Sequence, residues 1–424
     1  MKQSHGSSTD KRTRILIIGI GALGGTIAAR ALNAGLSVFM AARDEHVARS
    51  LRFSGLEVSG LGESITVPAF QLATVERYQT AAKFDLILLA TKAQEALGMS
   101  SQPLDLLRPG GAILSIQNGC VPLMLADQLG CETVLGGISN LAATMVEPGR
   151  FEQRNSGNLI LGEINGGLSE RGVQIEQILG KALKISLTPN LRAVIWAKLL
   201  INCSVTTIGA LTGQTMREYI RSSHGKEIFW RVYQETLAVA LASGTRPERM
   251  IVEPIPPRWS RQGAPARALD GWLDEMVETY GNAKASMMQD LERGRRTEID
   301  FINGYVAKLG RKIGLPTPMN SAITGLVHHL EQKRARPHPQ QLEKLLAKAA
   351  YRSESSSRLR WRREIAAEEQ KAMSGRLSSS TKPVERSVGV LERRSIAPRA
   401  HGTRVAGGDA HWGSSCRAGG SEAA

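Results

Sequence analysis

Short apolar runs alternate with helical patterns over the first third of the chain. Four nearly continuous apolar stretches have the length of strands: 14–19, 36–42, 84–91 and 111–117. Residues 22–33 are Ala-rich and helical, and Gly35 after them suits a helix C-cap. Strands without polar alternation, separated by helices, predict a parallel sheet covered on both faces. We therefore expect a doubly wound, Rossmann-like α/β domain over residues 14–188.

Helical periodicity dominates after Pro189. The expected helices span residues 191–211, 216–243, 266–279, 283–293, 298–314 and 320–332. Before them, the run GNLILGEI predicts one more strand and residues 174–183 one more helix, at a mixed edge of the sheet. A Rossmann-like domain followed by an all-helical domain over 189–333 is the plan of a two-domain dehydrogenase, with its active site in the cleft between the domains.

Both ends of the chain lack this patterning. Residues 1–13 are polar, and residues 334–424 are rich in Ser, Arg, Gly and Ala, with one short helix expected at 341–351. Such segments bury too little apolar surface to offset the entropy of ordering, so we expect both to be disordered. About half of the net charge of +15 lies beyond residue 335. A solvated basic tail is the favoured interpretation, and a tail that binds an acidic partner is the alternative.

Composition excludes several classes of protein. Aromatic residues make up 4% of the chain, which disfavours stacking of single-stranded nucleic acid. The four cysteines form no CxxC pair, so neither a metal centre nor a disulfide framework is expected. No uninterrupted apolar run approaches the ~20 residues that span a bilayer. We expect a cytoplasmic protein without membrane or nucleic-acid partners, and we leave a homodimer open.

A glycine pattern stands at the first strand–helix junction. Gly19-Ile20-Gly21-Ala22-Leu23-Gly24 reads G-x-G-x-x-G, directly after the first strand and at the start of the first helix. In that context the pattern predicts dinucleotide binding. The first glycine permits the tight turn, the second lets the backbone approach the pyrophosphate, and the third lets helix and strand pack closely. The helix N-terminus offers free N–H donors to the phosphates.

The end of the second strand indicates which dinucleotide binds. NAD enzymes place an acid there for the ribose hydroxyls, whereas NADP enzymes place a base for the 2′-phosphate. The first polar side chain after this strand is Arg43, and Asp44 follows it. The order favours NADP(H); a surface turn capped by Arg43 is the alternative.

Lys198 is the strongest candidate for a proton donor. The eight histidines leave the span 47–223 empty, although most of the cleft should form there. Lys198 interrupts the otherwise apolar helix IWAKLLINC, where a charge is costly without a purpose. Asn202, four residues later, shares its helix face. The alternative is a lysine that extends its ammonium group to solvent.

A second polar cluster runs from Ser286 through Asp290 to Glu298. Ser286 and Asp290 share one helix face. Glu298 begins a helical pattern, where an acid also complements the helix dipole. Spacing alone does not decide between functional and surface roles for these residues.

Several separated motifs, in order, resemble the ketopantoate reductase family (2-dehydropantoate 2-reductases). They are GIGALG at the glycine loop, LLATKAQ at Lys92, SIQNG at Asn118, WAKLLINC at Lys198, and SMMQDLERGRRTEIDFINGY from Ser286 through Glu298. The resemblance covers residues 14–332 and leaves the tail without a counterpart.

The resemblance implies how the cofactor and substrate are held. It places NADP(H) on the glycine loop, with Arg43 at the 2′-phosphate, Lys92 near the phosphates, and Asn118 and Glu298 beside the nicotinamide.

The resemblance also implies the reaction. It makes Lys198 the proton donor, held by Glu298, and places Asn118, Asn202 and Ser286 at the substrate. The implied reaction is the NADPH-dependent reduction of 2-dehydropantoate to (R)-pantoate, on the route to pantothenate and coenzyme A.

Two positions depart from the family pattern. Family members carry an asparagine where this chain has Thr206, and a P-N-G-E turn where it reads Gln214-Thr215-Met216-Arg217. Because a site built around substrate hydroxyls discriminates through such amides, a different small 2-oxo acid is the first alternative substrate. A non-catalytic NADP-binding protein is the second alternative, although Lys198 and Glu298 are both present.

Overall fold

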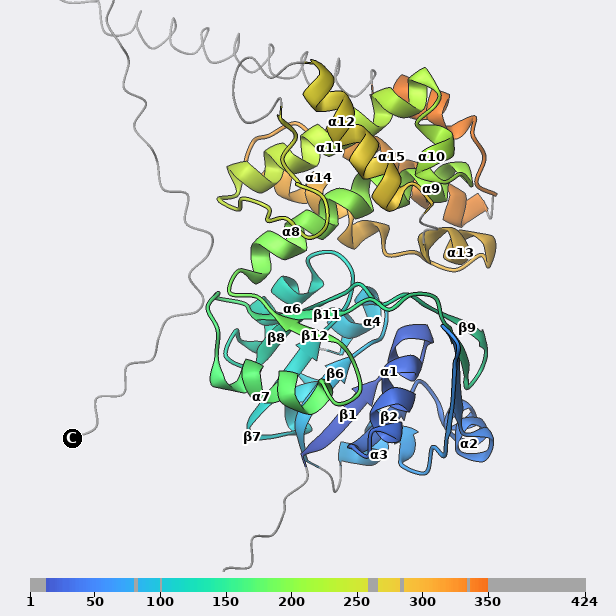
Figure 1. Ribbon diagram of the computed structural model, residues 1–424, viewed down its shortest axis with the longest axis vertical. Helices are drawn as coiled ribbons and strands as arrows, with labels where there is room; N and C mark the ends of the chain where they lie inside the picture. Colours follow the sequence, from blue (N-terminus) through green and yellow to red (C-terminus); the bar gives the residue numbers. More distant parts are fainter. Residues whose placement is uncertain are drawn as a thin grey trace, which may run out of the picture.

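The computed structural model describes residues 13–79, 83–99, 101–257, 266–282, 286–333 and 336–349. The chain forms an N-terminal lobe around a large sheet and a helical lobe above it (Figure 1). The large sheet has eight strands in the order β12-β11-β8-β7-β6-β1-β2-β5. The central strand β1 (Arg14–Ile18) pairs in parallel with β2 (Ser37–Ala42) on one side and β6 (Phe84–Leu89) on the other. The strand order therefore reverses at β1, which is where open α/β sheets bind ligands.

The expected doubly wound domain is confirmed. The other strands of the large sheet are β5 (Leu72–Thr74), β7 (Leu107–Ser115), β8 (Val134–Ser139), β11 (Leu159–Glu163) and β12 (Ile185–Leu187). Within the described residues of the large sheet, β8 and β11 pair antiparallel and the other neighbouring strands pair in parallel. The helices of this lobe are α1 (Ala22–Asn33), α2 (Glu45–Ser54), α3 (Val75–Gln79), α4 (Ala93–Gly98), α5 (Gln102–Asp105), α6 (Val121–Leu129) and α7 (Glu170–Leu179).

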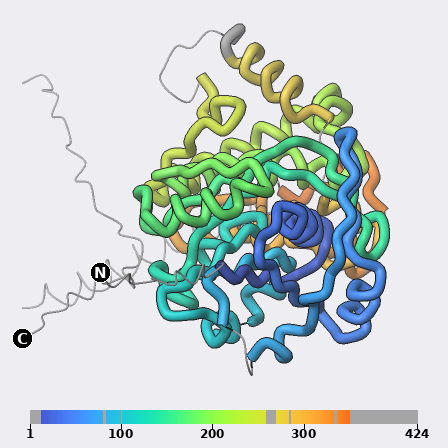
Figure 2. The backbone as a smooth tube through the Cα atoms, turned by 60° about the horizontal axis from the view of Figure 1, so that its bottom comes forward, coloured from blue at the N-terminus to red at the C-terminus, as the bar shows by residue number. Residues whose placement is uncertain are grey.

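The structure also contains a second, four-stranded sheet, which the sequence did not predict. It runs in the order β4-β3-β10-β9, from β3 (Leu56–Gly60), β4 (Glu63–Val67), β9 (Ala143–Glu147) and β10 (Arg150–Gln153). These strands contact α1, which Figure 2 shows nearly end-on beside them. Gly25 allows the close approach, because a Cβ there would lie 2.0 Å from the Phe151 ring. The strands are short and distant in sequence, so local periodicity gave no signal for their pairing.

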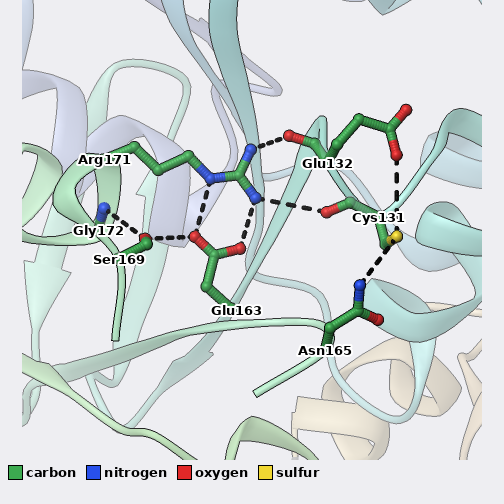
Figure 3. Close-up of polar contacts among 7 residues, drawn as sticks. All are labelled: Cys131, Glu132, Glu163, Asn165, Ser169, Arg171 and Gly172. Atoms are coloured by element: carbon green, nitrogen blue, oxygen red, sulfur yellow. Dashed lines mark hydrogen bonds and ion pairs between the residues drawn. The ribbon is translucent and has the colours of Figure 1, made fainter. Parts of the chain in front are cut away.

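The far edge of the large sheet is fastened to α7 by a polar cluster (Figure 3). Arg171 forms a two-pronged ion pair with Glu163, with N···O distances of 2.8 and 2.5 Å, and also donates to the Glu132 carbonyl. Ser169 caps α7 by accepting a hydrogen bond from the Gly172 N–H. The cluster lies away from the carboxyl end of β1 and serves to hold the sheet edge.

The helical lobe follows the expected order with several breaks. It contains α8 (Leu191–Ile201), a π-helix (Asn202–Thr206), α9 (Thr207–Thr212), α10 (Met216–Tyr219), α11 (Ser223–Ala242), α12 (Ala266–Tyr280), α13 (Ser286–Glu292), a 3₁₀ turn (Ile299–Phe301), α14 (Asn303–Lys312) and α15 (Pro318–Lys333). The helix expected at 191–211 is thus interrupted at Asn202. The helix expected from Glu298 begins after a 3₁₀ turn, and Glu298 itself precedes that turn.

The stretch Leu191–Thr212 is long and apolar enough to cross a membrane by length and composition. Its most apolar window is 83% buried inside the protein, as expected for a core helix. One continuous core runs from the α4 and α6 face of the large sheet into the helical lobe, and a second lies between the sheet, α1 and the small sheet.

Order extends beyond the expected domain boundary at 333. Residues 341–349 are helical, as predicted for that segment, and Leu342, Leu345 and Ala349 are buried in the core of the helical lobe. Before this helix, the His338 N–H donates to the Leu211 carbonyl at 3.0 Å. The expectation of a disordered segment from 334 is therefore wrong for this helix; residues 1–12 and 350–424 lie outside the described residues.

Candidate active site

A cleft of about 1510 Å³ separates the carboxyl ends of the central strands from the helical lobe. It is large enough for a dinucleotide and a small acid together. The predicted site residues that line it are Gly19, Ile20, Gly21, Ala22, Leu23, Arg43, Lys92, Asn118, Lys198, Asn202, Ser286 and Glu298. Gly24 lies beneath the loop instead. The structure therefore brings nearly all of the site residues predicted from the sequence together in one cleft.

The glycine loop has the shape that a pyrophosphate needs. Gly19 adopts φ +98°, and a Cβ there would lie 2.6 Å from the Thr91 backbone nitrogen. A Cβ at Gly24 would lie 2.0 Å from the Gly19 carbonyl oxygen, whereas one at Gly21 would meet no protein atom within 4 Å. Gly21 therefore leaves open space over the start of α1, and no acidic side chain in the first turn offsets the positive helix end. These residues fit a dinucleotide phosphate group.

Arg43 and Asp44 take different roles at the end of β2. Asp44 caps α2 by accepting a hydrogen bond from the Val47 N–H at 2.8 Å, and this bond lowers the pKa of its carboxyl group. The Arg43 side chain is 84% exposed and lines the cleft, although its Nε lies 3.0 Å from Asp44. The acid is thus engaged in helix capping, and the base is available to an anionic ligand.

Lys198 projects from α8 into the cleft. Burial lowers the pKa of its ammonium group from 10.5 to about 8. Its Nζ donates to the Ser139 carbonyl, and it forms no ion pair with any carboxylate of the described chain. A lysine in this state is a proton donor matched to neutral pH.

The π-helix after α8 shapes the wall beside Lys198. The Asn202 carbonyl accepts from the Thr206 and Thr207 hydroxyls at 3.0 and 2.8 Å. The Asn202 side chain lines the cleft beside Lys198. Thr206 also lines the cleft, but Met216 is 1% exposed in the core. Of the two departures, only Thr206 therefore alters the wall directly.

Glu298 contacts the N-terminal lobe rather than Lys198. Its Oε1 accepts from the Ala93 N–H at 2.9 Å, and its Oε2 accepts from the Asn118 amide at 3.4 Å. The expected Glu298–Lys198 contact is not formed in this structure, because the carboxylate is taken by these two donors. Nearby, Lys92 Nζ forms an ion pair with Asp290 at 2.5 Å.

Sequence reasoning missed several polar residues of the cleft. Ser139 ends β8 and Asn140 follows it, Asn282 follows α12, and Arg295 follows α13. Each stands at or just after the end of a strand or helix, a place where binding residues concentrate. The signal was present for Ser139 and Asn140, which lie at the end of a buried strand of the large sheet, but the loop positions after α12 and α13 carry no pattern of their own.

A glycine loop at a sheet switch point, faced by a helical lobe that places a buried lysine in the cleft between them, is typical of two-domain dinucleotide-dependent oxidoreductases.

Comparison with known proteins narrows this class to one family. Residues 15–166 match the family model for Ketopantoate reductase PanE/ApbA, and residues 190–331 match the model for its C-terminal domain. The chain belongs to the ketopantoate reductase family and is an oxidoreductase of that type, acting on a small keto acid with a nicotinamide dinucleotide.

Curated relatives and solved structures agree with this assignment. The 2-dehydropantoate 2-reductase of Pyrococcus horikoshii is 28% identical over 315 residues, which cover 74% of this chain and 96% of the relative. That of Mesorhizobium japonicum is 28% identical over 344 residues, covering 76% and 98%. A ketopantoate reductase from Ralstonia eutropha has a TM-score of 0.64 at 24% identity, over 76% of this chain and 99% of that one. D-Mandelate dehydrogenase with NADH and anilino(oxo)acetate has a TM-score of 0.64 at 21% identity, over 76% and 99%; both structures share the fold.

Proposed function

We propose that the protein reduces 2-dehydropantoate to (R)-pantoate with NADPH, and that Lys198 is the proton donor. The observation that carries the proposal is the Lys198 ammonium group, which lies in the cleft with its pKa lowered to about 8 and without a carboxylate partner. Bound NADPH supplies the hydride for the keto carbon. Lys198 protonates the keto oxygen, so that no alkoxide has to form unassisted.

Other residues orient the reactants. The Asn202 amide and the Ser286 hydroxyl, both on the helical side of the cleft, hold the substrate. Glu298 fixes Asn118 and the start of α4, so it acts as a positioning residue for the nicotinamide side of the cleft. In this role Glu298 sets the separation of the two lobes, which in turn sets how close Lys198 lies to the keto oxygen.

The preference for NADPH rests on Arg43. Its guanidinium lines the cleft, whereas Asp44, the acid that a ribose hydroxyl would need, caps α2. A 2′-phosphate offers Arg43 charge-assisted hydrogen bonds that a hydroxyl does not. Lys92, at the start of α4, lines the same cleft, and its ammonium group pairs with Asp290 at 2.5 Å, so a phosphate there would share this cation with the carboxylate.

The deciding experiment follows the loss of nicotinamide absorbance with 2-dehydropantoate and either NADPH or NADH. We expect a fast, NADPH-selective rate that Lys198→Ala reduces by at least ~100-fold. Near-normal turnover in the variant would exclude Lys198 as the donor.

A different small 2-oxo acid is the second candidate, favoured by Thr206 at the cleft wall. A hydroxyl at this position reaches less far than an asparagine amide, so the hydroxyl end of 2-dehydropantoate has one donor fewer. Parallel rates with a panel of branched and aromatic 2-oxo acids distinguish the two candidates. A cytoplasmic location and a homodimer stay predictions; a Staphylococcus aureus relative is described as a dimeric ketopantoate reductase.

A further inference from the structure

Arg217 reaches from α10 to the end of α12. Its backbone N–H donates to the Gly281 carbonyl at 3.0 Å. Its guanidinium donates to the Val277 carbonyl at 3.3 Å and forms an ion pair with Glu278 at 3.0 Å. The Val277 carbonyl also accepts from the Gly281 N–H at 2.8 Å, so Arg217 adds a second donor at the C-terminal end of α12 and fixes the residues that follow it.

Asn282 is the next residue in this arrangement. Arg217 Nε donates to Asn282 Oδ1 at 3.3 Å. Because a guanidinium only donates, the amide atom that faces it must be the oxygen, and the NH₂ group must point elsewhere. Asn282 lines the cleft, and its NH₂ group has no partner in the described part of the chain. Arg217 therefore orients two free N–H donors of Asn282.

Arg217, which contacts Asn282, lies in the segment that departs from the family pattern. Arg217 follows Met216, in the segment where the family pattern has an asparagine and this chain has none. Met216 is buried in the core and offers the cleft nothing. The residue beside it instead reaches across to a loop whose own amide lines the same cleft as Ser286.

We propose that Arg217 is a positioning residue for substrate binding, which holds Asn282 so that its N–H groups meet an oxygen of the 2-oxo acid. The inference rests on the proposed reductase function. It assigns to the pair Arg217–Asn282 the hydrogen-bond donation that the Met216 segment lacks. The group it recognises is an acceptor, either the carboxylate or a side-chain oxygen of the substrate.

The test compares kcat and KM for the best 2-oxo acid in Arg217→Ala, Arg217→Lys, Asn282→Ala and the double variant. We expect Arg217→Ala and Asn282→Ala each to raise KM by about 10-fold or more, the effect of losing one hydrogen bond to a charged group. Affinity for NADPH should stay within about twofold, since neither residue belongs to the glycine loop. The double variant should be no worse than either single one, because both changes remove the same contact. Arg217→Lys should restore part of the loss, as lysine keeps the charge without the planar fork.

Two further variants keep the test decisive. Arg231→Ala removes an arginine that forms an ion pair with Glu227 on its own helix and does not line the cleft, and this change should leave KM unchanged. Asn282→Asp can still accept from Arg217 but offers no N–H donor, so KM should rise even though the exposed side chain has little effect on folding. If Arg217→Ala fails to fold, the KM of Asn282→Asp still tests whether the Asn282 N–H groups bind the substrate.

Unchanged KM in Arg217→Ala and Asn282→Asp would overturn the inference, as would additive losses in the double variant. An inactive wild-type enzyme across all 2-oxo acids would instead refute the proposed function, and the substrate role of Arg217 would fall with it. An active wild type with unaffected variants removes this inference alone.

Discussion

Replacing Lys198 by methionine should change stability and activity in opposite directions. The Lys198 ammonium group is largely buried beside an apolar helix face, and within the described residues it donates to the Ser139 carbonyl. Methionine fills a similar volume without a charge. We expect the variant to be more stable than the wild type near neutral pH, to lose this advantage as the pH rises, and to lose reductase activity.

The magnitude follows from the pKa of Lys198, which is lowered from 10.5 to about 8 by burial. That difference corresponds to ~3 kcal/mol against the charged form in the folded state. Below pH 8 the lysine is charged in both folded and unfolded chains, so the wild type bears the full cost. Between about pH 8 and 10.5 the unfolded chain binds more protons than the folded one, and wild-type stability therefore rises with pH. The difference in unfolding free energy between Lys198→Met and wild type should thus shift by ~3 kcal/mol in favour of the wild type across this window.

Urea unfolding of both proteins at several pH values measures this difference. Lys181→Met, at an exposed lysine, is the matched control and should show no such dependence. The rate of NADPH-dependent reduction in the wild type should fall as pH rises through about 8, because the neutral amine cannot donate a proton. A stability difference that is flat from pH 7 to 10.5 would refute the reasoning, since it would mean that the lysine is well solvated.

Three further changes probe the cofactor loop and the C-terminal helix. Gly21→Ala should melt like the wild type but lose NADPH-induced stabilisation, whereas Gly24→Ala should melt at a lower temperature, because its Cβ would lie 2.0 Å from the Gly19 carbonyl oxygen; equal melting of the two variants without NADPH would contradict this. Arg43→Ala should raise KM for NADPH about 10-fold or more and leave that for NADH unchanged, the loss of a charge-assisted contact; parallel losses for both cofactors would argue for a role unrelated to the 2′-phosphate. Leu345→Ala should cost about 2–5 kcal/mol of unfolding free energy, as for other fully buried leucines; a loss within the error of urea titration would show that residues 341–349 do not belong to the folded unit.

The cofactor side of the fold could be predicted because its signals are local. The first two apolar strands, the glycine run and Arg43 stand within 30 residues of one another. Their meaning depends only on what directly precedes and follows them, and the helix expected at 22–33 has those bounds in the structure. The small sheet has no such signal, since β3 pairs with β10 about 90 residues later. The strands of the small sheet form only through their pairing with one another and their packing against α1.

Helix interiors were harder to predict for a related reason. Apolar periodicity continues without a break from residue 191 to 211, and nothing in it marks the π-helix at Asn202–Thr206. The extra residue per turn there is supported by Thr206 and Thr207, whose hydroxyls both bond to the Asn202 carbonyl. Inserted turns of this kind often occur at functional sites, and here one sets the direction of the Asn202 amide beside Lys198.

The role of Glu298 could not be predicted from sequence spacing. Its two hydrogen bonds join it to groups 205 and 180 residues earlier in the chain, so its role depends on how the lobes meet. Asp290 pairs with Lys92, the residue directly before the Ala93 N–H that Glu298 binds. Asp290 and Glu298 of the helical lobe thus bind two consecutive residues at the start of α4, Lys92 and Ala93. Hydride and proton must reach neighbouring atoms of one carbonyl group, and a misplacement of about 1 Å is costly. These two contacts therefore fix the distance between Lys198 on one lobe and the cofactor loop on the other.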